Sequence, residues 1–338
     1  MTNAKEENKK LVKISIRKHE SFEIRRGWLH KGIRNVLANS HLFTRNEADS
    51  NFACDKLGLG VNMVKALRYW LKATGLMTDV GGTQTITDIG RIINEHDQYF
   101  EERGTNYIIH YLLASNKENA TAWHWFYNEY RNTTIDKDTF VEEFTQECIR
   151  LQSGDEAASA PSTRVIEDEF NCLIRTYYRK SSEQEMDPEE TKMCPLIELR
   201  LITPLDSKDK EYKKMMPNRD DIHPLIAYAV ISKKQAVLKA IKEDNNKLSE
   251  VENNTKKQAL LVSNQIDINE LWKGENNIGK IFNLDRAAVF YIVEKLEQQG
   301  LVSVVRTAGL DVINVKREMT FEDCLREYYR EIGEVGNG

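Results

Sequence analysis

The order of secondary-structure signals between residues 48 and 93 constrains the fold of this chain more than any other feature. A short helix is followed by a turn at residues 58–60 and by a helix over residues 61–74, which Gly75 is placed to end. Two β-prone runs follow, with Gly81 and Gly82 between them, which is typical of a hairpin. Helix, tight turn, helix and a two-stranded wing is the order of a winged helix-turn-helix unit.

Residues 266–315 repeat this order. A short helix precedes a longer one that Asp285 can cap and Gly300 can end, and two β-prone runs follow. The repeat predicts a mainly α fold with two winged helix-turn-helix units flanking a helical middle domain. We expect three domains: residues 1–100, a basic extension and winged helix; residues 101–262, a helical middle domain with charged loops; and residues 263–338, a winged helix and an amphipathic terminal helix.

Two finer expectations concern the later parts of the chain. Thr320 and Asp323 have the spacing of a capping box, which predicts the start of the terminal amphipathic helix. Residues 207–221 are rich in charge, and we expect them to be exposed.

Charge is distributed unevenly along the chain. Residues 1–75 carry 15 Lys and Arg against 7 Asp and Glu, a net charge of +8, whereas the remaining residues carry 33 against 46, a net charge of −13. A basic N-terminal quarter on an acidic body favours one polyanion-binding face. It does not favour general adhesion to nucleic acid.

The helix over residues 61–74 is the candidate recognition helix. Its apolar residues recur on one side, and its other side carries cations and no acid. Asn and Arg side chains can read base edges, and Lys can neutralise phosphates. We therefore expect DNA to contact Asn62, Lys65, Arg68, Tyr69 and Lys72, with Gly81 and Gly82 of the wing near the DNA backbone.

The segment before this unit interleaves cations with aromatic residues. Arg25, Arg26 and Lys31 lie close to Phe22 and Trp28 in the sequence. The segment is equally consistent with a phosphate-contacting extension and with a domain edge whose aromatic residues are buried. In contrast, the second candidate helix, residues 285–299, carries a net charge of −1. It therefore favours a structural or protein-contact role.

Signals for other classes of protein are weak. The sequence contains no G-x-S-x-G or H-E-x-x-H motif and no C-x-x-C pair, so we expect no catalytic residues, no metal site and no cofactor. His110 and His124 flank an aromatic cluster, where core histidines are a better interpretation than a metal pair. No apolar run has the roughly 20 residues that span a bilayer, and we expect a cytoplasmic protein without membrane contact.

Seven stretches of the chain resemble a bacterial family known as domain of unknown function 4007. The resemblance runs in order over about residues 19–315 and is most specific near residues 58–70 and 113–125. The stretches are HESFEIRRGWLHKGI, KLGLGVNMVKALRYWLKATGL, LLASNKENATAWHWFYN, CLIRTYY, CPLIELRLI, HPLIAYAV and LDRAAVFYIVEKLEQQG.

The resemblance implies a role in bacterial defence. Genes of this family tend to lie in defence islands beside sulfur-transfer proteins similar to phosphoadenosine-phosphosulfate reductases, which belong to DNA phosphorothioation systems. It implies no catalytic residues.

The sequence thus favours a non-enzymatic, DNA-binding accessory protein of an anti-phage DNA modification or restriction system of the phosphorothioation type. Its expected partners are double-stranded DNA, sulfur-transfer or restriction proteins of the same gene cluster, and a second copy of the chain in a homodimer. Two alternatives stay open: a transcription regulator of its own defence operon, and a protein–protein adaptor that binds no DNA.

Overall fold

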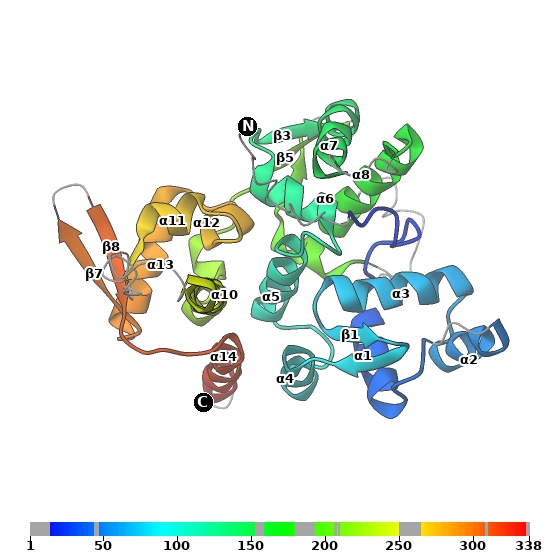
Figure 1. Cartoon of the computed structure of the whole chain (residues 1–338), viewed down its shortest axis with the longest axis horizontal. Helices are drawn as coiled ribbons and strands as arrows, with labels where there is room; N and C mark the ends of the chain where they lie inside the picture. Colours follow the sequence, from blue (N-terminus) through cyan, green and yellow to red (C-terminus); the bar gives the residue numbers. More distant parts are fainter. Residues whose placement is uncertain are drawn as a thin grey trace, which may run out of the picture.

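The computed structural model describes residues 14–43, 47–152, 159–179, 193–205, 208, 210–249, 265–307 and 310–335. The N-terminal elements lie at one end of the molecule, and the hairpin near the C-terminus lies at the other (Figure 1). Two helices, α5 (Arg103–Ala114) and α10 (Pro224–Ser249), lie between the two ends.

The N-terminal part is a group of helices with a hairpin. Its elements are α1 (Trp28–Ala38), α2 (Glu47–Leu57), α3 (Val61–Ala73), β1 (Met77–Val80), β2 (Thr83–Ile86) and α4 (Asp88–His96). The glycines predicted to shape it do so: Gly75 follows α3 with φ 65°, and Gly81 and Gly82 form the hairpin tip with φ 61° and 86°. Only glycine adopts these angles readily. α1 packs closely on α3 because Gly32 leaves room for Leu71.

The middle of the chain contains an antiparallel sheet that was not predicted from the sequence. Its elements are α6 (Thr121–His124), a π-helix (Trp125–Glu129), β3 (Thr134–Asp136), α7 (Lys137–Gln152), α8 (Thr163–Tyr177), a 3-10 helix (Pro195–Leu199), β4 (Ile202–Pro204), β5 (Glu211–Lys214) and a 3-10 helix (Arg219–Asp221). β5 is the central strand, and its Tyr212 pairs with Ile135 on one side and Pro204 on the other. The expectation that residues 207–221 are exposed is therefore wrong for Tyr212, which is 2% exposed.

The C-terminal part packs helices against a second three-stranded sheet. Its elements are β6 (Gln265–Asp267), α11 (Ile268–Lys273), α12 (Ile278–Ile281), α13 (Arg286–Gln298), β7 (Val302–Thr307), β8 (Leu310–Val315) and α14 (Phe321–Val335). Asp285 caps α13 as predicted, accepting a hydrogen bond from the Ala288 amide at 2.7 Å. The predicted capping box is also present, with reciprocal bonds between Thr320 and Asp323 of 3.2 and 3.0 Å.

The prediction of a mainly α protein with two winged helix-turn-helix units is wrong, because the described residues form a mixed α/β fold. Eight strands make three small antiparallel sheets, with strand orders β1-β2, β3-β5-β4 and β6-β8-β7. The C-terminal hairpin is not a two-stranded wing, since β6 adds a third strand on which Ile266 pairs with Ile313. The middle region, expected to be helical, has a sheet of its own. Strands of three or four residues are too short to show alternation, so local patterns do not indicate them.

A continuous hydrophobic core connects these parts. Between the N-terminal part and the middle, the Trp70 and Trp123 rings meet edge to face with centroids 5.3 Å apart. α14 of the C-terminal part packs on α10 and also on α4 of the N-terminal part. Its Tyr328 hydroxyl accepts a hydrogen bond from the Gly104 amide at 3.2 Å, at the start of α5. None of the described helices is both long enough and apolar enough to span a membrane.

Gly279 marks a close approach of α12 to the end of α11. A Cβ atom there would overlap the backbone of Trp272, which cannot rotate away as a side chain can. We therefore expect Gly279→Ala to lower the free energy of unfolding by about 1–3 kcal/mol, measured by urea denaturation. Gly333→Ala is the matched control, because no atom lies within 4 Å of a Cβ built there. Equal stability of the two variants would contradict the close contact.

Candidate functional site

The exposed side of α3 carries three of the residues predicted to contact DNA. Asn62 and Lys65 are exposed, and Lys72 is half-buried in the last turn of the helix. The Lys65 Nζ lies 3.4 Å from the Asn62 Oδ1. Within the part of the chain that the structure describes, neither lysine has an acidic side chain at ion-pair distance. The α3 surface, defined here as Asn62, Lys65 and Lys72, therefore presents two cations to solvent.

Arg68 and Tyr69 serve the fold instead of this surface. The Arg68 guanidinium binds the Asp79 carboxylate through its Nε at 2.8 Å and through Nη2, so that it ties α3 to β1. Tyr69 is only 9% exposed and lies beside the His19 ring, with centroids 6.0 Å apart. Burial, with the Glu169 carboxylate and the Cys172 thiol nearby, raises the pKa of Tyr69 well above its usual value. The structure therefore places both side chains against neighbouring parts of the protein.

The cations of the N-terminal extension also have partners within the protein. The Arg25 guanidinium lies over the Phe22 and Trp28 rings, 5.3 and 5.4 Å from their centroids. Arg26 forms an ion pair with Glu198. Lys31 donates a hydrogen bond from Nζ to the Leu57 carbonyl oxygen at 2.9 Å, which holds α1 against the end of α2. The sequence left open whether this segment is a phosphate-contacting extension or a domain edge with buried aromatic residues. These contacts favour the domain edge.

The start of α3 has a feature that the sequence indicated only as a turn. Gly60 occupies the N-cap position, so no side chain caps the helix, and the first turn contains no acidic residue. Gly58, Gly60, Val61 and Asn62 are exposed. The first amide groups of a helix lack partners within the helix and, with the helix dipole, attract anions. In the sequence, this open helix start is indicated by the Gly-x-Gly spacing at residues 58–60, directly before a helix that has no Ser, Thr, Asp or Asn at its N-cap position.

The hairpin tip lies open to solvent. Val80 is 76% exposed, and no atom lies within 4 Å of a Cβ built at Gly81 or Gly82. The tip is nevertheless held in shape, because the Gln84 side-chain amide donates a hydrogen bond to the Gly82 carbonyl oxygen at 2.8 Å. The structure thus places Gly81 and Gly82 where a large ligand has access to their backbone.

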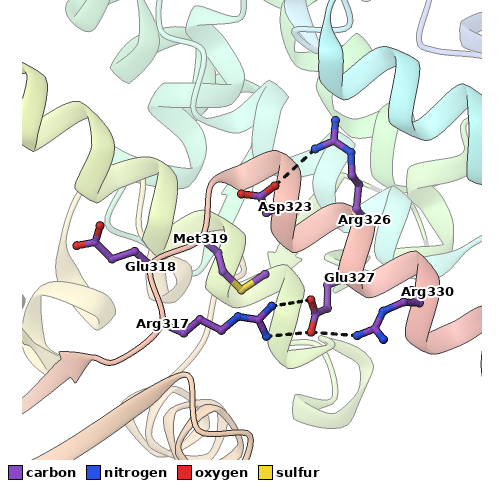
Figure 2. A pocket seen from close by; sticks show the side chains of 7 residues that line it. All are labelled: Arg317, Glu318, Met319, Asp323, Arg326, Glu327 and Arg330. Carbon is purple, nitrogen blue, oxygen red and sulfur yellow. Dashed lines mark hydrogen bonds and ion pairs between the residues drawn. The ribbon is translucent and has the colours of Figure 1, made fainter.

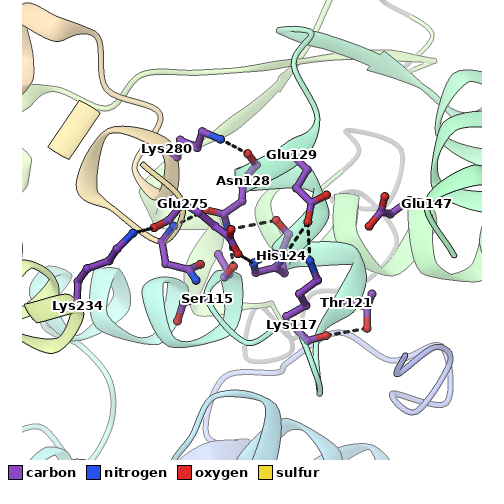
Figure 3. Close-up of polar contacts among 12 residues, drawn as sticks. Ser115, Lys117, Thr121, His124, Asn128, Glu129, Glu147, Lys234, Glu275 and Lys280 are labelled. Carbon is purple, nitrogen blue, oxygen red and sulfur yellow. Dashed lines mark hydrogen bonds and ion pairs between the residues drawn. The ribbon is translucent and has the colours of Figure 1, made fainter. Parts of the chain in front are cut away.

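The two histidines considered as a metal pair each have protein partners. His110 bonds the Tyr177 hydroxyl at 2.8 Å and the Ile281 carbonyl oxygen at 2.7 Å. His124 lies 3.0 Å from the Glu275 carboxylate and joins the middle of the chain to the C-terminal part (Figure 3). Burial lowers the pKa of His124, Lys117 lowers it further, and Glu275 and Glu129 oppose that shift. Across the described residues, no group of three or more His, Cys, Asp or Glu side chains is placed to hold a metal ion.

Near His124, polar contacts join the π-helix to α12 and α10 to α11, and Figure 3 draws part of this network. Lys117 bonds Glu129 at 2.9 Å, and Lys280 bonds the Asn128 carbonyl oxygen. Lys234 of α10 pairs with Glu270 and bonds the Glu275 carbonyl oxygen. Each of these cations has an acceptor within the protein, so the network fastens the C-terminal part to the middle.

A shallow pocket of 340 Å³ lies along α14 and is lined almost entirely by charged residues (Figure 2). Arg317 and Arg330 both bind the Glu327 carboxylate, at 3.0 and 3.2 Å, and Arg326 lies 3.6 Å from Asp323. The arginine side chains are more than half exposed. Such exposed ion pairs contribute little stability. Of these ion pairs, only the one between Arg317 and Glu327 joins the segment before α14 to the helix.

Comparison with known proteins gives one family and one fold. The family model described as protein of unknown function (DUF4007) matches residues 16–329. No curated protein matches the chain. A crystal structure of SspB is 20% identical, with a TM-score of 0.73 over 94% of this chain and 88% of that one. A magnesium-ion-bound crystal structure of SspB is also 20% identical, with a TM-score of 0.69 over 95% of this chain and 96% of that one. The mixed α/β fold is therefore that of SspB.

Proposed function

This chain belongs to the DUF4007 family, and on that premise we propose that it is a DNA-binding accessory protein of a bacterial DNA modification or restriction system of the phosphorothioation type. The position of the family's genes in defence islands, which the resemblance implies, supports a role in such a modification or restriction system. The likeness of the whole chain to SspB supports a shared architecture. The α3 surface supports the contact with DNA.

The observation that carries the proposal is the pair of cations on α3, with Lys65 near the uncapped N-terminus of the helix and Lys72 in its last turn. The whole chain has a net charge of −5, so a face that carries two cations without an acidic partner is more positive than the protein as a whole. Phosphate groups seek such cations and also the first amides of a helix. The exposed hairpin tip follows α3 directly in the chain and offers a second backbone contact.

We assign a binding role and not a catalytic one, because three buried basic side chains that could serve in catalysis, His19, His110 and Lys214, are engaged with protein partners. His19 is paired with Glu169, and His110 is bonded on both ring nitrogens. Lys214, which is buried, donates its hydrogen bonds to the carbonyl oxygens of Phe126 and Tyr130. These groups hold segments together.

The decisive variant is the double substitution Lys65→Glu with Lys72→Glu. We expect it to weaken binding to random-sequence duplex DNA at least tenfold, by removing two phosphate contacts and adding repulsion. The slope of log affinity against log salt should fall by about 1.8, since each phosphate contributes about 0.9. Fluorescence anisotropy across a salt series measures both. Arg68 is left unchanged, because Arg68→Glu would set a second carboxylate against Asp79 and damage the fold.

The matched control is Lys273→Glu with Lys316→Glu. Both lysines are exposed in the C-terminal part, and the change in net charge is the same. We expect this control to bind duplex DNA as the wild type does. Equal loss in both double variants would mean that net charge, and not the α3 surface, governs binding.

The same titration separates the remaining roles. Comparing phosphorothioate with ordinary duplexes tests the link to modification. Binding confined to the protein's own upstream region would favour a transcription regulator instead. Failure of the wild type to bind any duplex at low salt would contradict DNA binding and favour the adaptor, whose partners would be sought by co-purification with neighbouring gene products. Size-exclusion chromatography of the free and DNA-bound protein tests the homodimer.

A further inference from the structure

A second site of a different kind lies on the middle of the molecule. It is a pocket of 710 Å³ between the start of α7, the last turns of α8 and the central strand β5, elements that lie together in Figure 1. Its lining consists of Asp136, Lys137, Asp138, Phe170, Asn171, Ile174, Arg175, Tyr178, Lys208, Lys210 and Tyr212. None of these residues belongs to the α3 surface. The volume falls within the range of small-molecule and cofactor sites.

Aromatic rings form one wall of this pocket. Tyr212 packs against Phe170 and Tyr178, with ring centroids 6.0 and 5.9 Å away. Phe170 and Tyr212 are buried, whereas Tyr178 is half-buried at the end of α8. The two buried rings fix the wall, and the Tyr178 ring lies at its solvent edge. A planar, aromatic ligand group can stack on such an edge.

The charged groups of the lining carry a positive surplus. The lining includes four cationic side chains and two carboxylates, although the whole chain is acidic. Asp136 is already engaged, because its carboxylate accepts hydrogen bonds from the amide and hydroxyl of Thr139 at 2.8 and 3.0 Å. Arg175 forms an ion pair with Glu23, with 3.1 Å between the Arg175 Nε and the Glu23 Oε2. Lys137 is exposed at the first position of α7, where the helix dipole adds further positive potential.

An aromatic wall beside several lysines matches one class of ligand: a flat base joined to a phosphate. Proteins that hold unpaired nucleotides combine these two elements. We propose that this pocket binds a nucleotide, with the base against Tyr178 and the phosphate near Lys137 and Lys208. The nucleotide is either a free nucleoside phosphate or an unpaired nucleotide of a DNA strand. The pocket is separate from the duplex contact on α3. A result that contradicts one of the two sites therefore leaves the other untouched.

Calorimetric titration of the full-length protein tests the site. The probes are thymidine 5′-monophosphate, thymidine, inorganic phosphate, and a short single-stranded oligonucleotide with a 5′-phosphate. We expect the monophosphate to bind more tightly than thymidine or phosphate alone, because only it uses both the wall and the lysines. Much tighter binding of the oligonucleotide would identify a strand as the source, and equal binding a free nucleotide. Failure of the monophosphate and the oligonucleotide to bind at millimolar concentration would overturn the proposal.

Two pairs of variants identify the residues. Lys137→Glu with Lys208→Glu should weaken binding of the monophosphate about tenfold or more, yet leave duplex binding through α3 intact. The variant Lys65→Glu with Lys72→Glu should show the opposite pattern, so that failure of one site is distinguished from failure of the other. Tyr178→Leu should weaken binding about tenfold, whereas Tyr178→Phe keeps the ring and should bind like the wild type. Unchanged affinity in both Lys137→Glu with Lys208→Glu and Tyr178→Leu would overturn the proposal.

Discussion

Replacing Glu169 with alanine is expected to lower the free energy of unfolding by about 3–5 kcal/mol, the usual effect of breaking a buried charge pair. The Glu169 Oε1 lies 3.0 Å from the His19 Nε2, and their side chains are 1% and 0% exposed. The same oxygen accepts a hydrogen bond from the Arg17 amide. Removing the carboxylate leaves the buried His19 Nε2 and the Arg17 amide without their partner, and it releases the N-terminal segment from α8.

The interaction of His19 with Glu169 explains why the effect is large. Burial alone lowers the pKa of His19, but Cys172 and Glu169 raise it well above its usual value of 6.5. Burial also raises the pKa of the Cys172 thiol, which is therefore neutral at neutral pH. Glu169 is then the charge that His19 faces. Since the folded-state pKa is raised, the stability gained from this pair is fully present below pH 6.5 and is lost as pH rises through the raised pKa.

Glu169→Gln is the matched control. Its side-chain oxygen can still accept the hydrogen bonds from Arg17 and His19, but the negative charge is gone. We expect a smaller loss than in the alanine variant, and a weaker dependence of stability on pH above 6.5 than in the wild type. Urea denaturation of the three proteins across this pH range measures both quantities. Equal stability of wild type and Glu169→Ala at pH 6 would show that the pair does not hold the segment.

Local signals in the sequence predicted local structure well. Asp285 caps α13, and Thr320 and Asp323 form the reciprocal bonds expected of a capping box. Gly75 and Gly300 adopt positive φ angles after the helices that they were expected to end. Each of these features depends on residues within one turn of each other, so the chemistry of a few neighbours determines the outcome.

The fold class was not predictable in the same way, because it depends on pairing between distant segments. β5 contains Lys213 and Lys214, which suggest an exposed loop when the sequence is taken alone. Lys214 is nevertheless buried, since its ammonium group donates to two backbone carbonyl oxygens. The strand becomes evident only when β3 and β4 are brought to its two sides.

The candidate site shows a similar division. Helical spacing placed Asn62, Lys65 and Lys72 on the exposed side of α3. It also placed Tyr69 there, but the N-terminal segment covers this part of the helix and sets His19 beside the tyrosine ring. Arg68 is neutralised by Asp79 from the following hairpin. Spacing along one helix cannot reveal what a neighbouring element brings against it.

His110 is expected to make the protein sensitive to acid. Its Nε2 faces the Ile281 carbonyl oxygen, which can only accept, so this nitrogen carries the proton and Nδ1 accepts from the Tyr177 hydroxyl. The neutral ring therefore satisfies both partners. A second proton would add a charge inside the core, where the Tyr127 and Phe282 rings pack around the imidazole. Burial accordingly lowers the pKa of His110 to about 4, although its bond to Ile281 opposes the shift.

The direction of the pH effect follows from that lowered pKa. Between pH 6.5 and about 4 the unfolded chain binds a proton at His110 that the folded protein does not bind. The free energy of unfolding should therefore fall as pH falls through this window, by about 3 kcal/mol in total for this one group. At neutral pH, where both states are unprotonated, the group contributes no pH dependence.

His110→Gln isolates this contribution. Glutamine can still donate to the Ile281 carbonyl oxygen but does not titrate, and losing the bond to Tyr177 should cost about 1–3 kcal/mol at pH 7. We expect the stability of the variant to fall less steeply between pH 6.5 and 4, so that the two curves converge in acid. The control is His41→Gln, because His41 is exposed and its replacement should leave the profile unchanged. Parallel curves for wild type and His110→Gln would contradict a buried, neutral His110, since only a histidine that titrates alike in both states leaves the slope untouched.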